Sequence, residues 1–304
     1  MTGTRPRITV VGGANTDVVG MPDGVFVARD SNPGHVRVSP GGVARNVAEN
    51  LARLGAEVRF ITAFGSDAPS AALEDECRAA GIDTTFSVRV PDMPGCSYLA
   101  VMDETGDLVG AINDMRALDA LTADSLAAAA FAGADAVVLD SNLQPDTIAR
   151  VVALAGDAPV VLDPVSTVKG PRAAEALARI GAIKANRAEA ELLAGVRGAR
   201  EAAEALVAAG VGWAFVTLGV EGAWCASAED AFALAPADAR AINATGAGDA
   251  FTAGIAWGIA TGLGIRQTAA LARRLSGLAL ESERTVSERV GPDVLRADEG
   301  EGQR

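Results

Sequence analysis

The stretch Ala136-Val137-Val138-Leu139-Asp140 is a short apolar run that ends in a carboxylate. A run of this length and composition is typical of a strand that is buried on both faces of a sheet. Three runs of the same kind follow it, at residues 160–163, 182–184 and 214–217, with helical patterns between them. This alternation predicts an α/β fold, with a doubly wound, mainly parallel sheet flanked by helices.

The same pattern begins well before residue 136. Residues 43–54 carry apolar side chains at helical spacing, and a strand is expected at residues 58–63. The apolar positions of the expected helix are Val43, Val47, Leu51 and Leu54. We therefore expect the 304 residues to form a single large α/β domain with an appendage. We expect residues 296–304, which are charged and contain glycine, to be frayed.

Two segments interrupt the α/β pattern, and both have the features of a separate small sheet. Residues 18–39 are rich in turn formers, and residues 86–112 contain two strand-like runs around a turn at residues 103–107. We expect these segments to form a β-sheet lid. Because so small a sheet needs a partner to bury one of its faces, we also expect the lid to pair two copies of the chain as a homodimer.

The charge of the chain disfavours some classes of partner. Its formal net charge is −13, and the acidic residues are scattered along the sequence. Such a field repels nucleic acid and anionic membranes, so we expect a small-molecule partner and neither of those two. The 3 dispersed cysteines fit a reducing compartment. Since the sequence also shows no leader peptide and no apolar span of about 20 residues, we expect a cytoplasmic protein.

The run Asn243-Ala244-Thr245-Gly246-Ala247-Gly248-Asp249-Ala250-Phe251 precedes a helical pattern and is the most informative part of the sequence. Its small residues allow backbone amides to converge on an anion where a helix begins, and the helix dipole favours negative charge there. A phosphate of ATP could bind at this place. Asp249 would lie in the first helical turn, where a carboxylate can take a proton from an attacking hydroxyl group.

An ordinary helix start explains the same nine residues as well, because short glycine motifs recur by chance. The chain also lacks the Walker motif, in which Gly-Lys is followed by Ser or Thr. Any phosphate chemistry here would therefore follow the pattern of another family.

A second long motif makes that family recognisable. Residues 41–48 read Gly-Gly-Val-Ala-Arg-Asn-Val-Ala, and Gly-Ser-Asp follows at 65–67. Together with residues 243–258, these stretches resemble, in the right order, the N-terminal and C-terminal motifs of the ribokinase-like (PfkB) carbohydrate kinases. Shorter landmarks also match, at residues 12–17, 163–164, 184–189 and 217–222. The resemblance covers nearly the whole chain and implies a ribokinase-like fold and an ATP-dependent sugar or nucleoside kinase.

The resemblance assigns roles to residues at both motifs. The expected catalytic residues are the base Asp249 and the anion-hole residues Gly246, Ala247 and Gly248. The expected acceptor-binding residues are Asn15, Asp17, Gly42 and Asn46. An Asp can accept two hydroxyl protons from a diol, while an Asn supplies a donor and an acceptor. Without the family, Asn15 and Asp17 are simply turn formers after a strand.

Further residues match the nucleotide and metal positions of the family. Asn186 and Glu189 match its Asn-x-x-Glu element, which helps to place Mg²⁺ and its water ligands. The same spacing is a helix capping box, and both roles can coexist. Asp163 ends a strand, where it can order metal-bound waters or cap the next segment. The expected nucleotide-binding residues are Asn186, Thr217, Gly219, Gly222 and Asn243. The implied cofactors are ATP and Mg²⁺, and a monovalent cation stays open.

Four further elements, at residues 30–34, 97–99, 111–115 and 163–166, resemble those of the pseudouridine kinases within this family. A uracil-like base presents an imide N–H and carbonyl groups, so its pocket needs amides or hydroxyls. The candidates are Ser31, Asn32 and Asn113, although residues 31–34 could equally be a turn. Lys169 is another candidate, through contact with substrate or phosphate.

The resemblance therefore implies ATP-dependent phosphorylation of the 5′-hydroxyl of pseudouridine, giving pseudouridine 5′-phosphate and ADP. The alternatives within the family are a ribokinase, another nucleoside kinase or a keto-sugar kinase. A catalytically silent sugar-binding protein is an alternative of a different class. The retained Asp249 and the intact Gly246-Ala247-Gly248 argue against it, because a pure binder would not require both.

Overall fold

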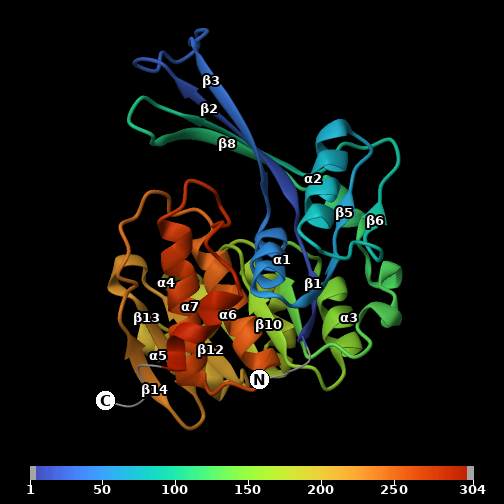
Figure 1. Ribbon diagram of the computed structural model, residues 1–304, viewed down its shortest axis with the longest axis vertical. Coiled ribbons are helices and arrows are strands. Elements are labelled where there is room, and N and C mark those ends of the chain that lie inside the picture. Colours follow the sequence, from blue (N-terminus) through green and yellow to red (C-terminus); the bar gives the residue numbers. More distant parts are fainter. Residues whose placement is uncertain (1–4, 300–304) are drawn as a thin grey trace.

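The structure is a computed structural model that describes residues 5–299, and side chains from 5 to 295. Its centre is an eight-stranded sheet in the order β14-β13-β12-β11-β10-β9-β1-β4 (Figure 1). The strands are β1 (Arg7–Val11), β4 (Glu57–Ile61), β9 (Ala136–Asp140), β10 (Val160–Asp163), β11 (Ala182–Asn186), β12 (Trp213–Thr217), β13 (Ala223–Ser227) and β14 (Ala231–Leu234). The six strands from β12 to β4 are parallel, and β13 and β14 are antiparallel additions at one edge. The expected doubly wound, mainly parallel sheet is confirmed.

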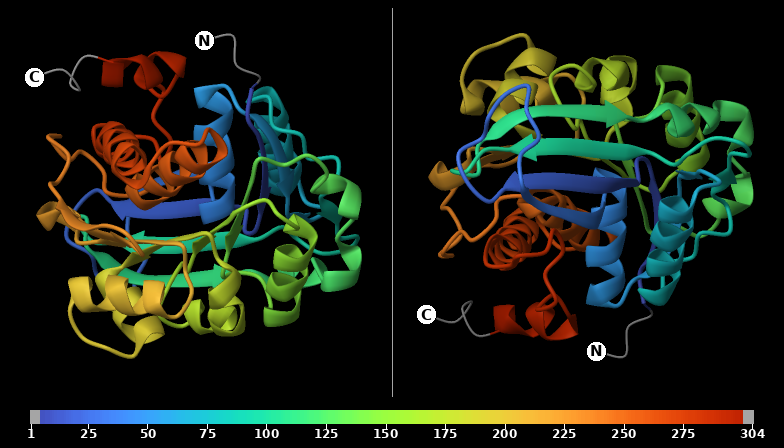
Figure 2. Two further views of the ribbon diagram at one scale, coloured as in Figure 1. Left: turned by 90° about the horizontal axis from the view of Figure 1, so that it is seen from below. Right: turned by 90° about the horizontal axis from the view of Figure 1, so that it is seen from above.

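Helices cover both faces of this sheet (Figure 2). One face packs against α1 (Val43–Leu54), α2 (Ala68–Ala79), α6 (Ala247–Ala260) and α7 (Ile265–Leu280). The other face packs against α3 (Pro145–Ala155), the 3-10 helix η4 (Gly170–Arg179), α4 (Arg187–Ala194) and α5 (Ala199–Ala208). Successive strand residues point to opposite faces. Val138 therefore belongs to the first core and Leu139 to the second, which explains why a strand of this sheet is apolar throughout.

The second sheet projects above the main domain (Figure 1). It has the order β3-β2-β7-β8, formed by β2 (Asn15–Pro22), β3 (Gly34–Gly41), β7 (Ser97–Met102) and β8 (Leu108–Asp114). We call it the lid sheet. The expected turn at residues 103–107 joins β7 and β8, and the amides of Thr105 and Asp107 both donate to the Asp103 carboxylate.

The boundaries expected for the lid segments need correction. Residues 86–96 lie outside the lid sheet, because β6 (Val88–Arg89) pairs instead with β5 (Ala63–Phe64). The amide of Val88 donates to the carbonyl of Thr62, so this segment is anchored beside the end of β4. The strand expected at residues 58–63 is correspondingly divided between β4 and β5.

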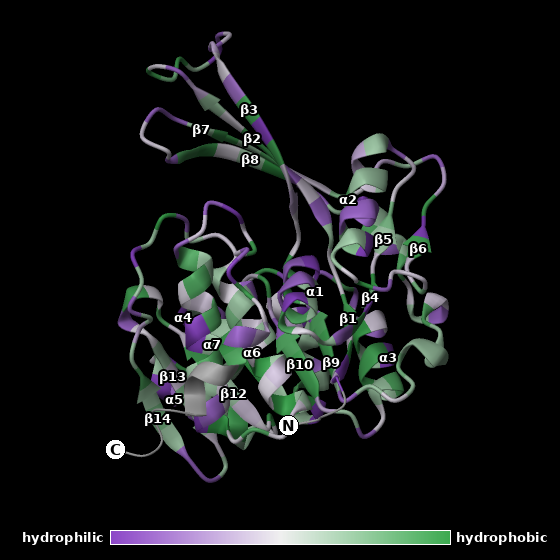
Figure 3. Cartoon of the chain, in the orientation of Figure 1, coloured by the Kyte–Doolittle hydropathy of each residue, from purple (hydrophilic) through white to green (hydrophobic). Residues whose placement is uncertain are grey.

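The two faces of the lid sheet differ in polarity. Residues directly opposite each other on neighbouring strands share a face. One such row consists of Ser39, Asp17, Tyr98 and Asn113. The adjacent row, on the other face, consists of Val38, Val18, Leu99 and Ile112, and we call it the apolar row. Three of its side chains are exposed, Val38 by 63%, Leu99 by 44% and Ile112 by 67%, and Figure 3 shows hydrophobic residues along these strands.

The 3-10 helix η6 (Pro292–Glu299) takes up the first part of the tail that was expected to be frayed, and residues 300–304 lie outside the described residues. All three cysteines are buried free thiols. Within residues 5–299, the structure has no helix long and apolar enough to cross a membrane.

Candidate active site

The candidate site lies at the carboxyl edge of the main sheet, beneath the lid sheet (Figure 1). Loops after β1, β9 and β10 meet there with the first turns of α1 and α6. In open α/β sheets, ligands bind outside the carboxyl ends of the parallel strands. The two long motifs of the sequence thus meet at this edge of the sheet.

The start of α6 has the backbone geometry of an anion site. Gly246 precedes the helix with φ of 86°, and a methyl group on it would lie 2.1 Å from the carbonyl oxygen of Thr285. Only glycine fits both conditions. Within the described residues, the amides of Gly246 and Gly248 have no hydrogen-bond acceptor. Free amides at a helix N-terminus favour a bound anion.

Asp249 lies in the first turn of α6, beside these amides. Its Oδ2 accepts a hydrogen bond of 2.7 Å from Nδ2 of Asn46 on α1. Desolvation by the surrounding protein, followed by the negative charge of Asp163, raises the pKa of Asp249 to about 7. The charge of Lys184 and the Asn46 bond oppose this rise. A carboxylate with a pKa near neutrality is suited to act as a general base.

The acceptor residues predicted from the sequence lie together at the base of the lid sheet. Nδ2 of Asn15 donates to the carboxylate of Asp17, whose pKa is raised by burial and is lowered in part by that bond. A methyl group on Gly41 would lie 2.3 Å from the Asp17 carboxylate, so the missing side chain leaves room for it. Gly42 has φ of 99° and lies tightly against the carbonyl of Gly13.

Asp140, at the end of β9, also helps to build the site and was missed by the sequence analysis. Its Oδ2 accepts hydrogen bonds from the amides of Gly13 (2.9 Å) and Ala44 (3.2 Å). The Asp140 carboxylate therefore ties the loop after β1 to the first turn of α1. Burial raises the pKa of Asp140, and the hydrogen bonds from Gly13 and Asn142 oppose that rise. Its place at the end of a buried strand, like that of Asp163, is the sequence feature from which a role of Asp140 in the site could have been predicted.

A polar pair borders the acceptor residues. Nζ of Lys169 donates to Oδ1 of Asn142 at 2.6 Å. A methyl group on Gly13 would lie 2.9 Å from Nδ2 of Asn142 and 3.1 Å from Cε of Met115. Gly13 thus lies between the acceptor residues and a surface with three kinds of side chain. These are the amide of Asn142, the ammonium group of Lys169 and the apolar side chain of Met115. Lys169 was a sequence candidate, whereas Asn142 was not.

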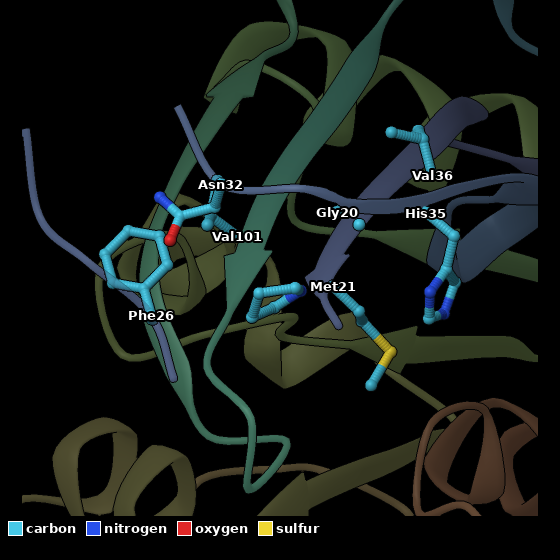
Figure 4. A pocket seen from close by; sticks show the side chains of 9 residues that line it. Gly20, Met21, Phe26, Asn32, His35, Val36 and Val101 are labelled. Carbon is cyan, nitrogen blue, oxygen red and sulfur yellow. The ribbon is translucent and has the colours of Figure 1, made fainter. Parts of the chain in front are cut away.

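The structure does not bring Ser31 and Asn32 to this site. They lie in the loop between β2 and β3, at the end of the lid sheet remote from Asp17. Pro22, where β2 ends, is five residues beyond Asp17, or about 16 Å along a strand. The side chain of Asn32 is used within its own loop, where it accepts from the amide of Val27 and donates to the Val27 carbonyl. Asn32 also borders a small cavity at this tip, with Phe26 and Met21 (Figure 4). Asn113 is placed differently, since it shares a face of the sheet with Asp17.

A second cavity, of about 490 Å³, adjoins the start of α6. Its lining includes Thr217, Gly219, Gly222, Ala247 and Gly248. The remaining lining side chains are mainly apolar and small, with Phe251, Leu234 and Leu280 the largest of the hydrophobic ones. Such a cleft can hold a flat base, with phosphates directed to the helix N-terminus. Asn243 does not line this cavity, and its side chain accepts a hydrogen bond from the amide of Thr245.

Asn186 and Glu189 form the capping box of α4. Oδ1 of Asn186 accepts from the amide of Glu189 at 2.9 Å, and Oε2 of Glu189 accepts from the amide of Asn186 at 2.8 Å. Within the described residues, Oε1 of Glu189 receives no hydrogen bond, so one oxygen remains for a water ligand of a cation. This fits Mg²⁺, which binds oxygen and usually keeps several waters. Burial, the leading influence, raises the pKa of Glu189.

Both carboxylate oxygens of Asp163 have partners, unlike those of Glu189. Its Oδ1 accepts from the amide of Val165, and its Oδ2 accepts from Thr252 and forms a 2.8 Å ion pair with Nζ of Lys184. Burial alone would lower the pKa of Lys184, but the charges of Asp163, Asp249 and Glu189 outweigh it, and the pKa is raised. Lys184 is therefore a buried cation held by Asp163, and the sequence analysis gave it no role.

The chain is similar to known proteins over most of its length. A family model described as pfkB family carbohydrate kinase matches residues 5–289. The chain is 34% identical to a pseudouridine kinase of Escherichia coli over 290 residues, which is 92% of each protein. A solved carbohydrate kinase from Agrobacterium tumefaciens is 30% identical with a TM-score of 0.84, over 96% of each chain. The Arabidopsis thaliana ribokinase solved with ribose and ATP shares the fold, with a TM-score of 0.81 and 21% identity over 96% of this chain and 98% of that one.

Proposed function

Because the chain belongs to the pfkB family of carbohydrate kinases, we propose that it transfers the γ-phosphoryl group of ATP to the 5′-hydroxyl of pseudouridine. The observation that carries the kinase part is the bond between Asn46 and Asp249, which joins the acceptor residues to the anion site. The choice of pseudouridine is supported by the similarity to the E. coli enzyme over most of both chains.

The proposed transfer is a single displacement. As the acceptor hydroxyl oxygen forms a bond to the γ-phosphorus, its proton passes to the Asp249 carboxylate. The bond between the γ-phosphorus and the bridging oxygen breaks, and its electron pair leaves with ADP. The free amides of Gly246 and Gly248 stabilise the charge on the phosphoryl oxygens. When bound near Glu189, Mg²⁺ would neutralise part of the phosphate charge.

The acceptor residues account for the choice of a primary hydroxyl. Asp17 can accept hydrogen bonds from the two hydroxyls of a ribose diol, and Asn15 fixes the orientation of its carboxylate. Asn46 lies next to Asp249 and limits how the sugar can enter. With the diol held at Asp17, the 5′-hydroxyl is the one that can reach Asp249.

The base would then lie toward Asn113 and the Asn142–Lys169 pair. Asn142 and Lys169 offer donors for the carbonyl groups of a uracil-like base, and an asparagine can also accept from an imide N–H. Pseudouridine has one more free ring N–H than uridine. A site that pairs this group loses free energy when the substrate lacks it. Ser31 and Asn32 could contribute only after a rearrangement of the lid tip.

A substrate panel tests the proposal. With ATP and Mg²⁺, we expect kcat/KM for pseudouridine to exceed that for uridine, ribose and adenosine. Equal or better use of uridine or ribose would refute the specificity and leave a kinase of the same family. Failure to turn over any sugar or nucleoside acceptor would favour the silent sugar-binding protein.

A further inference from the structure

We propose that Lys184 is a further catalytic residue, whose ammonium group contacts the phosphoryl group while it is transferred at the start of α6. The inference rests on the proposed kinase function and adds a cation to the amides of the anion site. Lys184 lies near the carboxyl end of β11, and only 8% of the residue is exposed.

The approach of Lys184 to Gly248 carries the argument. A methyl group on Gly248 would lie 3.0 Å from Nζ of Lys184 and 3.4 Å from its Cε. Gly248 is not among the residues with positive φ, so its backbone conformation alone does not require glycine. The absent side chain instead lets an ammonium group come close to a helix N-terminus that already favours anions.

The balance of charge favours a cation at this place. Asp163 forms an ion pair of 2.8 Å with Lys184, and the charges of Asp249 and Glu189 also act on it, so three carboxylates act on one ammonium group. Without that group, the incoming phosphates of ATP would meet uncompensated negative charge. Of the atoms that crowd Gly246 and Gly248 in the described structure, Nζ of Lys184 is the cationic one.

A purely structural role is the competing explanation, in which Lys184 only neutralises Asp163. The ion pair is buried, so Lys184→Met leaves a buried carboxylate unpaired and destabilises the fold. The double variant Lys184→Met/Asp163→Asn removes both charges and relieves that problem. Lys184→Arg keeps the charge in a larger group, and Asp163→Asn alone is the reference for the double variant.

The four variants are compared by melting temperature, kcat and KM. We expect the double variant to melt closer to the wild type than Lys184→Met does. We expect its kcat to remain about 10²-fold or more below that of Asp163→Asn, as when one charge-stabilising donor is lost. We expect Lys184→Arg to recover part of that turnover. A kcat of the double variant within about threefold of Asp163→Asn would overturn the proposal, since Lys184 would then act only on Asp163.

A binding measurement separates this inference from the acceptor assignment. ADP and the non-hydrolysable analogue AMP-PNP are titrated into the wild type and the double variant with Mg²⁺ and no acceptor. We expect the affinity for AMP-PNP to fall about tenfold or more relative to that for ADP, because only AMP-PNP carries a γ-phosphoryl group. An unchanged ratio of the two affinities would refute the contact. This outcome does not depend on which sugar or nucleoside the wild type uses.

Discussion

Nδ2 of Asn46 lies 2.7 Å from Oδ2 of Asp249, although 203 positions separate the two residues in the chain. Asn46 lies in the first turns of α1, and Asp249 lies in the first turn of α6. The bond therefore joins the two motifs that resemble the carbohydrate kinases. It also orients the carboxylate and leaves its second oxygen for a substrate proton.

Asp249→Asn should abolish most turnover while nucleotide and acceptor binding persist. The amide keeps the shape of the carboxylate but cannot accept the proton, and loss of a general base costs about 10²–10⁴-fold in rate. Single-turnover rates and equilibrium binding of ADP are the measurements. Near-normal turnover in the purified variant would exclude Asp249 as the base.

The activity should fall on the acid side of neutrality. Burial and the charge of Asp163 raise the pKa of Asp249 to about 7, and only its ionised form can take the proton. kcat/KM should therefore level off above about pH 8, reach about half of that value near pH 7, and fall about tenfold per pH unit well below it. A rate that stays constant down to pH 5 would show that the base titrates in its ordinary range.

Loss of the Asn46 side-chain amide should shift the pH dependence of kcat/KM to higher pH. The hydrogen bond from Asn46 lowers the pKa of Asp249. Asn46→Ala should thus raise that pKa and shift the acid limb of kcat/KM to higher pH. An unchanged limb, or one at lower pH, would indicate that another group controls the profile.

Gly41→Ala should weaken acceptor binding specifically. The added methyl group would lie 2.3 Å from the Asp17 carboxylate, which must then turn away from its place beside Asn15. We expect the KM for the acceptor to rise about tenfold or more, and the KM for ATP to change little. Gly110→Ala is the matched control, because it lies in the same sheet and its methyl group would meet nothing within 4 Å. Equal effects of the two substitutions would show that the Asp17 contact is unimportant.

A second copy of the chain should cover the apolar row of the lid sheet. Val38, Leu99 and Ile112 are exposed in the same row on one face, and burying them would be favourable. We expect a dimer in sedimentation and scattering measurements, and a monomer for Val38→Glu/Ile112→Glu.

Val25→Glu is the control for the lid prediction, since Val25 is 74% exposed but lies outside the sheet. A monomeric wild type would refute the pairing. Dissociation by the control as well would show that the effect of the glutamates is not confined to the apolar row. Scattering with and without acceptor also tests closure, and an identical shape in both states would argue against a moving lid.

Local sequence patterns were enough to predict the main elements. Apolar runs such as Ala136–Asp140 specified buried strands, and the helical spacing of apolar residues at 43–54 specified α1 with the right ends. The run of small residues at the start of α6 was also recognisable, because small residues that let backbone amides converge form a local pattern. These features depend on short stretches of backbone and on hydrophobic periodicity, so the sequence by itself determined them.

The tertiary structure decided which polar residues meet. Asn32 was a plausible base contact, but its amide is satisfied within its own loop, and the sheet carries that loop away from Asp17. Lys184 was part of an apolar strand pattern, and only the packing of β11 against α6 brings its ammonium group to Gly248. Strand order, crossover connections and helix packing set such distances between remote residues. Periodicity fixes the face on which a residue lies, and it does not fix the residue across from it.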